Sequence, residues 1–391
     1  MAIRTSTYGT CSEQPMIKKI LLSLLAILVA LGIGGFAFYQ TSDQFGADLT
    51  DEQLAIYKHS INFTGEEFLN QIETLEDTSF DNLMGMLDEY LNSPIITEPS
   101  KPVEVIKVDR DTLLANTSET QILWFGHSSF LMQINGMNLL FDPMLTGTPA
   151  PHPMLGGDRY SPELPISIAD LPQADAVFIS HDHYDHLDLE SIQQLNSKVG
   201  HYFVPLGVGL HLKEWGIATS RITELDWWQT AKLGDTEFTF TPSHHFSGRR
   251  LEGRNRTLWG GWVVKDAQQT IYYSGDGGYG PHFKEIGQRF GEIDLALVEC
   301  GQYNERWANI HLMPEQTIQA GMEANVKVIM PVHWGAFTIA LHAWDDPIER
   351  AIAEAEKENQ AIIAPQIGEI VRVNQPPAVN WWWRKYSANN N

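Results

Sequence analysis

The sequence contains few cysteines and few basic residues. Only two cysteines, Cys11 and Cys300, occur in 391 residues, and the apolar segment between them would place them on opposite sides of a membrane if it spans one. A disulfide between them is therefore not expected, and a disulfide-based scaffold is excluded. Lysine and arginine total 26 against 49 aspartates and glutamates, a formal net charge of −23. Because such an acidic chain repels phosphate backbones, we expect no nucleic-acid partner.

The composition also excludes a disordered or collagen-like chain. Hydrophobic residues make up 43% and charged residues 19% of the sequence, which is typical of globular proteins. No internal repeat is visible at the usual solenoid periods. The length suffices for one large core or two domains.

One long apolar segment lies near the N-terminus. Residues 20–38 carry no charge, Lys18 and Lys19 precede them, and acidic residues follow. We therefore interpret 16–41 as a membrane-spanning signal-anchor, with the following chain on the non-cytoplasmic (periplasmic or extracellular) side. The alternative is a cleaved export signal and a secreted protein, although no clear cleavage motif follows. Residues 1–15 are an N-terminal extension, because Met16 is itself a normal start for such a segment.

The rest of the chain changes character twice. Residues 42–117 are acidic, and apolar spacing predicts helices over 66–75 and 81–91, which we interpret as a helical stalk with a linker or as an N-terminal decoration of the following domain. Residues 118–374 contain short β-runs and helical stretches, which predicts one domain of sheets covered by helices. Residues 375–391 form a C-terminal tail. The predicted strands cover 122–125, 130–134, 137–141, 176–179, 238–241, 262–264, 271–273, 295–298, 328–332 and 370–373, and the helices 189–195, 313–324 and 347–358.

Residues 181–186 read His-Asp-His-Tyr-Asp-His and follow the β-run 176–179 directly. His181 and His183 are two apart, so in extended backbone they point the same way, while Asp185 and His186 lie past a bend. Neutral imidazole and carboxylate suit zinc, and also iron or manganese. Five ligand-type residues in six at a strand end therefore predict a metal site rather than a solvated polar turn.

Three other β-runs end in the same way. His244 and His245 follow 238–241, Asp276 follows 271–273, and His333 follows 328–332. These residues divide into two sites if Asp276 bridges them. One site holds His181, His183 and one of His244 or His245, and the other holds Asp185, His186 and His333.

This pattern resembles the metallo-β-lactamase superfamily with its HxHxDH loop. Within it, the chain is similar to the N-acylphosphatidylethanolamine-hydrolysing phospholipase D group and its bacterial relatives, described as outer-membrane or lactonase-like proteins. The resemblance covers about residues 118–373, and the segments that carry it are 124–130, 181–188, 242–249, 255–262, 274–279, 283–287 and 333–335. It implies an α/β fold of the αββα sandwich type, with an N-terminal transmembrane helix and a short helical extension added in this chain.

The resemblance also implies the ligands and the chemistry. His181, His183 and His245 would hold the first metal, Asp185, His186 and His333 the second, and Asp276 both. His245 is preferred to His244 because it occupies the histidine of the group's Pro-x-x-His-Trp stretch. Two Zn²⁺ ions, or Mn²⁺ or Fe²⁺, would lower the pKa of a bridging water that attacks phosphorus or a carbonyl carbon. Asp185 or Asp276 would orient this water.

The expected function is a dinuclear zinc hydrolase of phosphodiester or ester bonds. Its partners would be a small-molecule or lipid substrate, such as an N-acylphosphatidylethanolamine-type lipid, and a membrane through the N-terminal helix. The alternative enzyme is a lactonase acting on small or acylated lactones. The alternatives of another class are an iron-dependent redox enzyme and a non-catalytic metal-binding protein.

Further residues near these motifs each allow a functional and a structural interpretation. His127 lines the pocket or is a core histidine, and Asp142 hydrogen-bonds a ligand imidazole or caps a turn. His244 lies beside the site or in contact with a ligand, Arg249 contacts a substrate phosphate or is a solvated surface residue, and His311 donates a proton to the leaving group or caps a helix.

Two further features lie outside the motifs. Cys300 is expected to be a buried thiol rather than a reactive one, and 381–385 rests on a membrane or packs as a tail.

Overall fold

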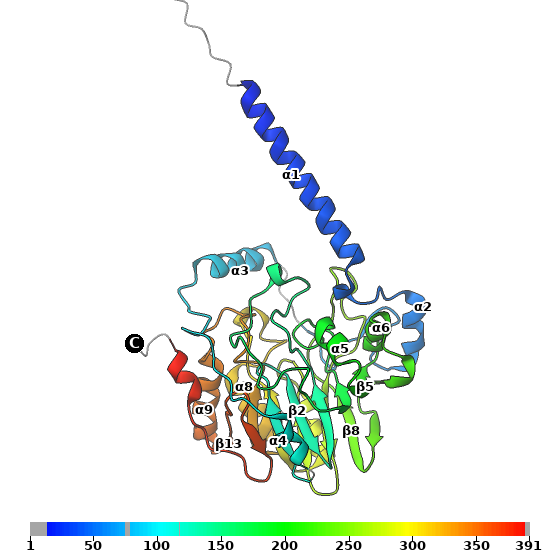
Figure 1. Cartoon of the computed structure of the whole chain (residues 1–391), viewed down its shortest axis with the longest axis vertical. Coiled ribbons are helices and arrows are strands. Elements are labelled where there is room, and N and C mark those ends of the chain that lie inside the picture. The colour runs from blue at the N-terminus through cyan, green and yellow to red at the C-terminus, as the bar shows by residue number, and fades with distance from the viewer. Residues whose placement is uncertain (1–13, 75–78, 117, 388–391) are drawn as a thin grey trace, which may run out of the picture. The chain divides into compact units, whose positions relative to one another are not determined.

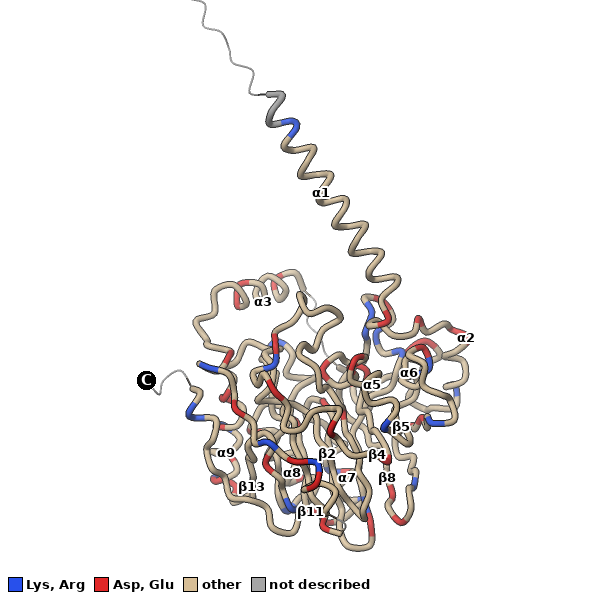
Figure 2. The backbone as a smooth tube through the Cα atoms, viewed as in Figure 1, with Lys and Arg blue, Asp and Glu red and all other residues tan. Residues whose placement is uncertain are grey.

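The computed structural model describes residues 14–74, 79–116 and 118–387, and forms two compact units that meet in the sequence between Phe45 and Gly46. The first unit consists of α1 (Gln14–Thr41) and the short helix η1 (Asp43–Phe45). Lys18–Thr41 is long and apolar enough to cross a membrane, and Figure 2 shows charge on this helix only near its N-terminal end. The predicted apolar helix is confirmed as a helix. Cys11 and residues 1–13 lie outside the described residues.

Two seven-stranded sheets face each other in the second unit (Figure 1). The first sheet has the order β14-β1-β2-β3-β4-β5-β6, with β14 (Ile370–Arg372), β1 (Gln121–Trp124), β2 (Phe130–Ile134), β3 (Met137–Phe141), β4 (Ala174–Phe178), β5 (Val199–Pro205) and β6 (Ile222–Leu225). The second has the order β13-β12-β11-β10-β9-β8-β7, with β13 (Ala361–Ile362), β12 (Val326–Val332), β11 (Ile293–Glu299), β10 (Thr270–Tyr273), β9 (Gly261–Lys265), β8 (Thr236–Thr241) and β7 (Thr230–Leu233).

Helices cover the outer faces of both sheets. The first sheet packs against α4 (Arg110–Ala115), α5 (Leu189–Leu195) and α6 (Val208–Glu214), and the second against α7 (His282–Phe290), α8 (Pro314–Glu323) and α9 (Asp346–Glu358). The shorter elements are α2 (Asp51–Leu54), α3 (Phe80–Asn92), η2 (Ala55–His59), η3 (Pro153–Leu155), η4 (Thr219–Arg221), η5 (Glu305–Trp307) and η6 (Trp382–Tyr386). The layers are those of the expected αββα sandwich, which is confirmed.

The alternation of side chains along the strands explains the layers. In β2, Phe130, Met132 and Ile134 pack between the two sheets, whereas Leu131 points to the helices on the outer face. Both faces of the sheets are buried. Successive side chains of a strand therefore point to opposite faces, but the side chains on both faces are apolar. Asn135-Gly136 forms the predicted hairpin between β2 and β3, with both residues at positive φ.

The interpretation of 42–117 as a stalk is wrong, because this segment contributes to the core of the unit, and so does the C-terminal tail. Leu54, Tyr57 and Phe68 pack into the cluster between the sheets, and so do Trp382 and Trp383. A segment that buries large apolar side chains in this way is part of the domain, not a spacer. The tail likewise packs rather than presenting its tryptophans to a membrane.

The helix predicted over 66–75 is also wrong for its described residues, 66–74. Residues 65–74 are irregular, and Phe63 forms a β-bridge with Phe68. The Phe68 N–H donates to Asn255 O at 2.8 Å, a long-range bond that a helix would not allow. Tertiary contacts override the apolar spacing in this segment. The second predicted helix, over 81–91, is confirmed as α3.

The strand directions place the predicted metal ligands at one edge of the two sheets. β1 and β3 run parallel to β4 within the first sheet, and β8 and β10 run parallel to β11 and β12 within the second. The loops or strand ends at this edge carry His127, Asp142, 181–186, 244–245, Asp276, Glu299 and His333.

Candidate metal centre

The structure brings three of the predicted histidines together as a first group. His181, His183 and His245 each offer a ring nitrogen within 4.8 Å of the others. His181 Nε2 lies 2.9 Å from His183 Nδ1, which in turn lies 3.3 Å from His245 Nε2. His244, the alternative, is not in this group, and its Nε2 lies 2.8 Å from Thr74 Oγ1 instead.

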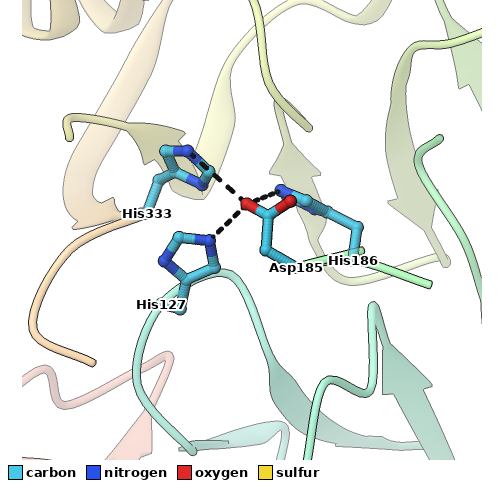
Figure 3. A group of neighbouring side chains, drawn as sticks. All are labelled: His127, Asp185, His186 and His333. Carbon is cyan, nitrogen blue, oxygen red and sulfur yellow. Dashed lines mark hydrogen bonds and ion pairs between the residues drawn. The ribbon is translucent and has the colours of Figure 1, made fainter. Parts of the chain in front are cut away.

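A second group consists of Asp185, His186, His333 and also His127 (Figure 3). The three imidazoles point towards the Asp185 carboxylate in Figure 3. Its Oδ2 lies 2.8 Å from His127 Nε2, 3.3 Å from His186 Nε2 and 4.0 Å from His333 Nε2. His127, which follows β1, therefore lies at this group rather than in the apolar core.

Asp276 lies between the two groups. Its Oδ2 is 3.0 Å from His186 Nε2 and 3.9 Å from His181 Nε2, and its Oδ1 is 3.1 Å from His333 Nδ1. One carboxylate thus approaches residues of both groups, as a bridging ligand must.

Four of these histidines are held in the neutral form that binds metals. Burial, aided by neighbouring imidazoles, lowers the pKa of His181, His245 and His333 well below the ordinary value. Burial also lowers the pKa of His183 to about 4. Neutral imidazole leaves a lone pair for a cation at physiological pH.

The carboxylates of Asp276 and Asp185 favour positive charge at the centre. Burial raises the pKa of Asp276 to about 7, and burial alone would lower the pKa of His186. Asp276 and Asp185 outweigh this effect and raise the pKa of His186 well above its ordinary value. His186 Nε2 and Asp276 Oδ1 are buried and make no hydrogen bond of normal geometry. This donor set fits divalent cations of the zinc, iron or manganese type.

Asp142 makes the contact predicted for it. It lies after β3, fully buried, and its Oδ2 is 2.8 Å from His186 Nδ1. The same carboxylate accepts from Ser180 N at 2.7 Å, Ser180 Oγ at 2.5 Å and Tyr273 OH at 2.5 Å. With Nδ1–H donated to Asp142, the Nε2 of His186 is directed to Asp185 and Asp276.

The turns that carry two of these histidines are strained. His127 has φ 53° and His333 has φ 67°, values that L side chains adopt at a cost of about 1–3 kcal/mol. Their main chains are joined, because His127 N donates to Trp334 O at 2.9 Å and His333 N donates to His127 O at 3.0 Å. The two sheets therefore fix each other's site loops.

Glu299 is a site residue that the sequence motifs did not indicate. It is fully buried at the end of β11, and burial raises the pKa of its carboxyl group well above the ordinary value. Oε1 contacts His311 Nδ1, and Oε2 accepts from Gly277 N at 2.5 Å. His311 thereby joins a group with Asp276, Glu299 and His333. Its position at a strand end was the signal that could have identified Glu299.

His211 is another residue that the motifs did not indicate, and together with Asp182 of the 181–186 motif it supports that loop from behind. Asp182 accepts from Gly248 N at 2.7 Å and Thr257 Oγ1 at 2.9 Å, and lies 3.3 Å from His211 Nε2. Burial raises its pKa, but these donors, His211 first, outweigh it and hold the pKa of Asp182 at about 2. His211 Nδ1 in turn accepts from Ala47 N at 2.9 Å.

Asn70 holds the main chain of His245 from both sides. Its Oδ1 accepts from His245 N at 3.1 Å, and its Nδ2 donates to His245 O at 2.7 Å. The same Oδ1 also accepts from Trp259 Nε1 at 2.9 Å, and the same Nδ2 also donates to Thr74 Oγ1 at 2.7 Å. His245 Nδ1 donates to Ile310 O at 2.9 Å, which directs Nε2 to the first group.

Arg249 does not lie with the metal-type residues. It is buried and donates to Asp182 O at 2.8 Å and to Leu187 O at 2.6 Å. Its guanidinium lies 4.1 Å from the centre of the Tyr184 ring and 5.2 Å from that of Trp215. Arg249 is therefore not a solvated surface residue, and its bonds to Asp182 O and Leu187 O brace the 181–187 loop. Cys300 is buried, as predicted.

A cavity of about 510 Å³ opens beside His245. Leu69 and Ile72 contribute apolar surface, Phe246 lies 4.5 Å from the His183 ring, and the Arg254 guanidinium lies 4.0 Å from the Phe246 ring centre. The cavity offers space for an amphiphilic group next to the first group of histidines.

The fold and the convergent histidines and carboxylates define the class of metal-dependent hydrolases. A family model described as beta-lactamase superfamily domain matches residues 137–334. An uncharacterised protein of Mycobacterium tuberculosis is 35% identical over 353 residues, 89% of this chain and 94% of that protein. The N-acyl-phosphatidylethanolamine-hydrolyzing phospholipase D 1 of Caenorhabditis elegans is 30% identical over 265 residues, 63% of this chain and 74% of that protein. The chain belongs to the beta-lactamase superfamily.

The solved structures agree with this assignment at the level of the fold. A metallo hydrolase of Ignicoccus hospitalis, Igni18, matches with a TM-score of 0.50 at 20% identity, over 65% of this chain and 98% of that one. The expected superfamily is confirmed by the family model and the relatives.

Proposed function

We propose that the protein is a two-metal hydrolase of phosphodiester bonds in a lipid of the N-acylphosphatidylethanolamine type. The observation that carries this proposal is the position of Asp276 between two groups of buried ligand-type residues. His181, His183 and His245 would hold one Zn²⁺, and Asp185, His186 and His333 the other. Two such cations lower the pKa of a water and polarise the bond under attack.

The side chains around the cations orient the reactants. Asp185 is 14% exposed, and His186 and His127 outweigh burial and hold its pKa well below the ordinary value. Its ionised carboxylate accepts a hydrogen bond from the attacking water and aligns it. His311 is also 14% exposed, and Glu299 fixes its ring. We assign His311 the transfer of a proton to the leaving oxygen.

Three observations support a lipid substrate. The relative from Caenorhabditis elegans is named for hydrolysis of N-acylphosphatidylethanolamine. The cavity beside His245 combines apolar side chains with Arg254. The first unit is an apolar helix of membrane-spanning length, and we propose that it anchors the catalytic unit on the non-cytoplasmic side.

The test is metal analysis of the purified full chain with lipid hydrolysis and the variant Asp276→Asn. We expect two zinc or manganese ions per chain, release of phosphatidate, and a folded variant with at least 10³-fold lower turnover, a loss of about 4 kcal/mol in transition-state stabilisation. Full turnover by this variant would refute the two-metal scheme. One redox-active iron per chain would support the redox alternative.

A lactonase is the second candidate, and the position of Arg249 favours it. Its guanidinium is bonded to two backbone carbonyls, and we take this use of the cation in bracing a loop as support for a substrate without a phosphate. Hydrolysis of acylated lactones without release of phosphatidate would select this candidate.

A further inference from the structure

The helix α3 exposes a broad apolar stripe. None of its thirteen residues is buried, and Phe80, Tyr90 and Leu91 are 73%, 72% and 67% exposed. At 100° per residue, these three side chains share one face of the helix with Leu83, Met84 and Leu87. Soluble domains normally turn such a stripe inward, so this one indicates a partner.

The polar face of α3 is the face that contacts the domain. Arg306 in η5 lies 3.3 Å from Glu89 and donates to Asn82 Oδ1 at 2.9 Å, and Asn304 Nδ2 donates to Glu89 Oε1 at 3.0 Å. Gly85 lies against the Arg306 guanidinium so closely that a Cβ there would be 2.7 Å from it. This packing fixes the rotation of the helix and holds the apolar stripe outward.

We propose that the apolar face of α3 docks on the surface of a lipid bilayer. The proposal rests on the membrane anchor of the proposed function. α1 ends at Thr41 and the catalytic unit begins at Gly46, so the connection is five Cα–Cα steps, at most about 18 Å of chain. A domain on so short a connection to a membrane anchor always stays close to the bilayer. Lipid is therefore favoured over a diffusing protein as the partner of the apolar face of α3.

The charge of the helix selects the kind of lipid. α3 carries Asp81, Asp88 and Glu89 and no lysine or arginine (Figure 2). Anionic headgroups would repel it, so contact with phosphatidylcholine or phosphatidylethanolamine is apolar and insensitive to salt. The helix is joined through Asn304 and Arg306 to the segment that leads along the chain to His311.

A spin label on the stripe tests the docking directly. Leu87→Cys is made in a full-length Cys11→Ser chain, labelled with a nitroxide and reconstituted in phosphatidylcholine vesicles, while the buried Cys300 stays unlabelled. We expect oxygen to relax the label more than a water-soluble nickel complex does. Gln268→Cys, in the exposed turn between β9 and β10, serves as the water-facing control.

Two outcomes would overturn the proposal. One is a Leu87 label as accessible to nickel as the Gln268 label, and the other is a label shielded from both reagents, which would indicate a protein partner such as a second copy.

Kinetics provide a second test. Leu87→Asp is expected to lower the hydrolysis of lipid in vesicles at least fivefold and to leave bis(p-nitrophenyl) phosphate hydrolysis unchanged. Asn92→Asp adds the same charge on the polar flank of α3 and is expected to change neither rate. Equal loss on both substrates would contradict a docking role. If no substrate is hydrolysed, the proposed function fails, while the label still decides the docking.

Discussion

Replacing Asp142 by asparagine tests whether the carboxylate behind His186 organises the metal centre. Asp142 accepts four hydrogen bonds, three of them at Oδ2 and one, from Ser180 N, at Oδ1. If the asparagine of the variant places its amide oxygen at the position of Oδ2, its NH₂ group takes the position of Oδ1 and faces the Ser180 N–H. One buried N–H is then unpaired, at about 1–3 kcal/mol, and three bonds to a charged acceptor become neutral ones, at about 1 kcal/mol each.

The sum is a loss of about 4–6 kcal/mol in the free energy of unfolding. For a domain of this size, such a loss lowers the melting temperature by on the order of 8 °C. The affinity of the Asp185, His186 and His333 site should fall about 10- to 100-fold, because the His186 ring loses its orienting partner. Thermal unfolding and zinc content after dialysis measure both effects.

Asp175→Asn is the matched control for this variant. Asp175 is an exposed aspartate of the neighbouring strand β4 that accepts a single bond from Asn138 N at 2.8 Å. We expect it to keep the parent's melting temperature and metal content. An Asp142→Asn protein that melts and binds zinc as the Asp175→Asn protein does would refute the reasoning.

Further predictions concern the supports of the site and the pH dependence of stability. Asn70→Ala should weaken the His181, His183 and His245 site about 10- to 100-fold. We expect zinc to fall from two to one per chain, whereas the exposed Gln71→Ala keeps two. Arg249→Ala should lower the stability by about 3 kcal/mol, since two buried carbonyls lose their donor. It should slow phosphodiester and lactone hydrolysis equally, and a selective loss with phosphodiesters would restore Arg249 to phosphate binding. Burial raises the pKa of Glu224, so its contribution to stability is fully present below the unfolded value of about 4.3 and is lost as the pH rises through the folded value. Glu224→Gln should therefore flatten the dependence of melting temperature on pH in this window, and identical profiles would contradict the assignment.

Local patterns in the sequence carry most of the fold. The strands predicted at 130–134 and 137–141 have the observed bounds, because two apolar faces and Asn135-Gly136 leave little choice. β5 was not predicted, although it is buried in the first sheet, because Gly200 and His201 interrupt its apolar run. β13, with two residues, is too short to leave a pattern.

The ligand-type residues were predictable because strand ends collect at one edge of each sheet. The supports of those residues were not, since Asn70 and His245 are 175 positions apart and Ala47 and His211 are 164 apart. No spacing rule connects such pairs. The irregular segment around Phe68 shows the same limit, because the Phe68 N–H is bonded to Asn255 O, which lies far along the chain.

The bond from Ala47 to His211 restricts where the chain can be cut. A protease that sheds the catalytic unit must cleave between Thr41 and Ala47, close to the helix end, or the amide that orders His211 and Asp182 is removed with the leader. Any released form, natural or recombinant, should therefore start no later than Gly46 to keep its 181–186 loop intact.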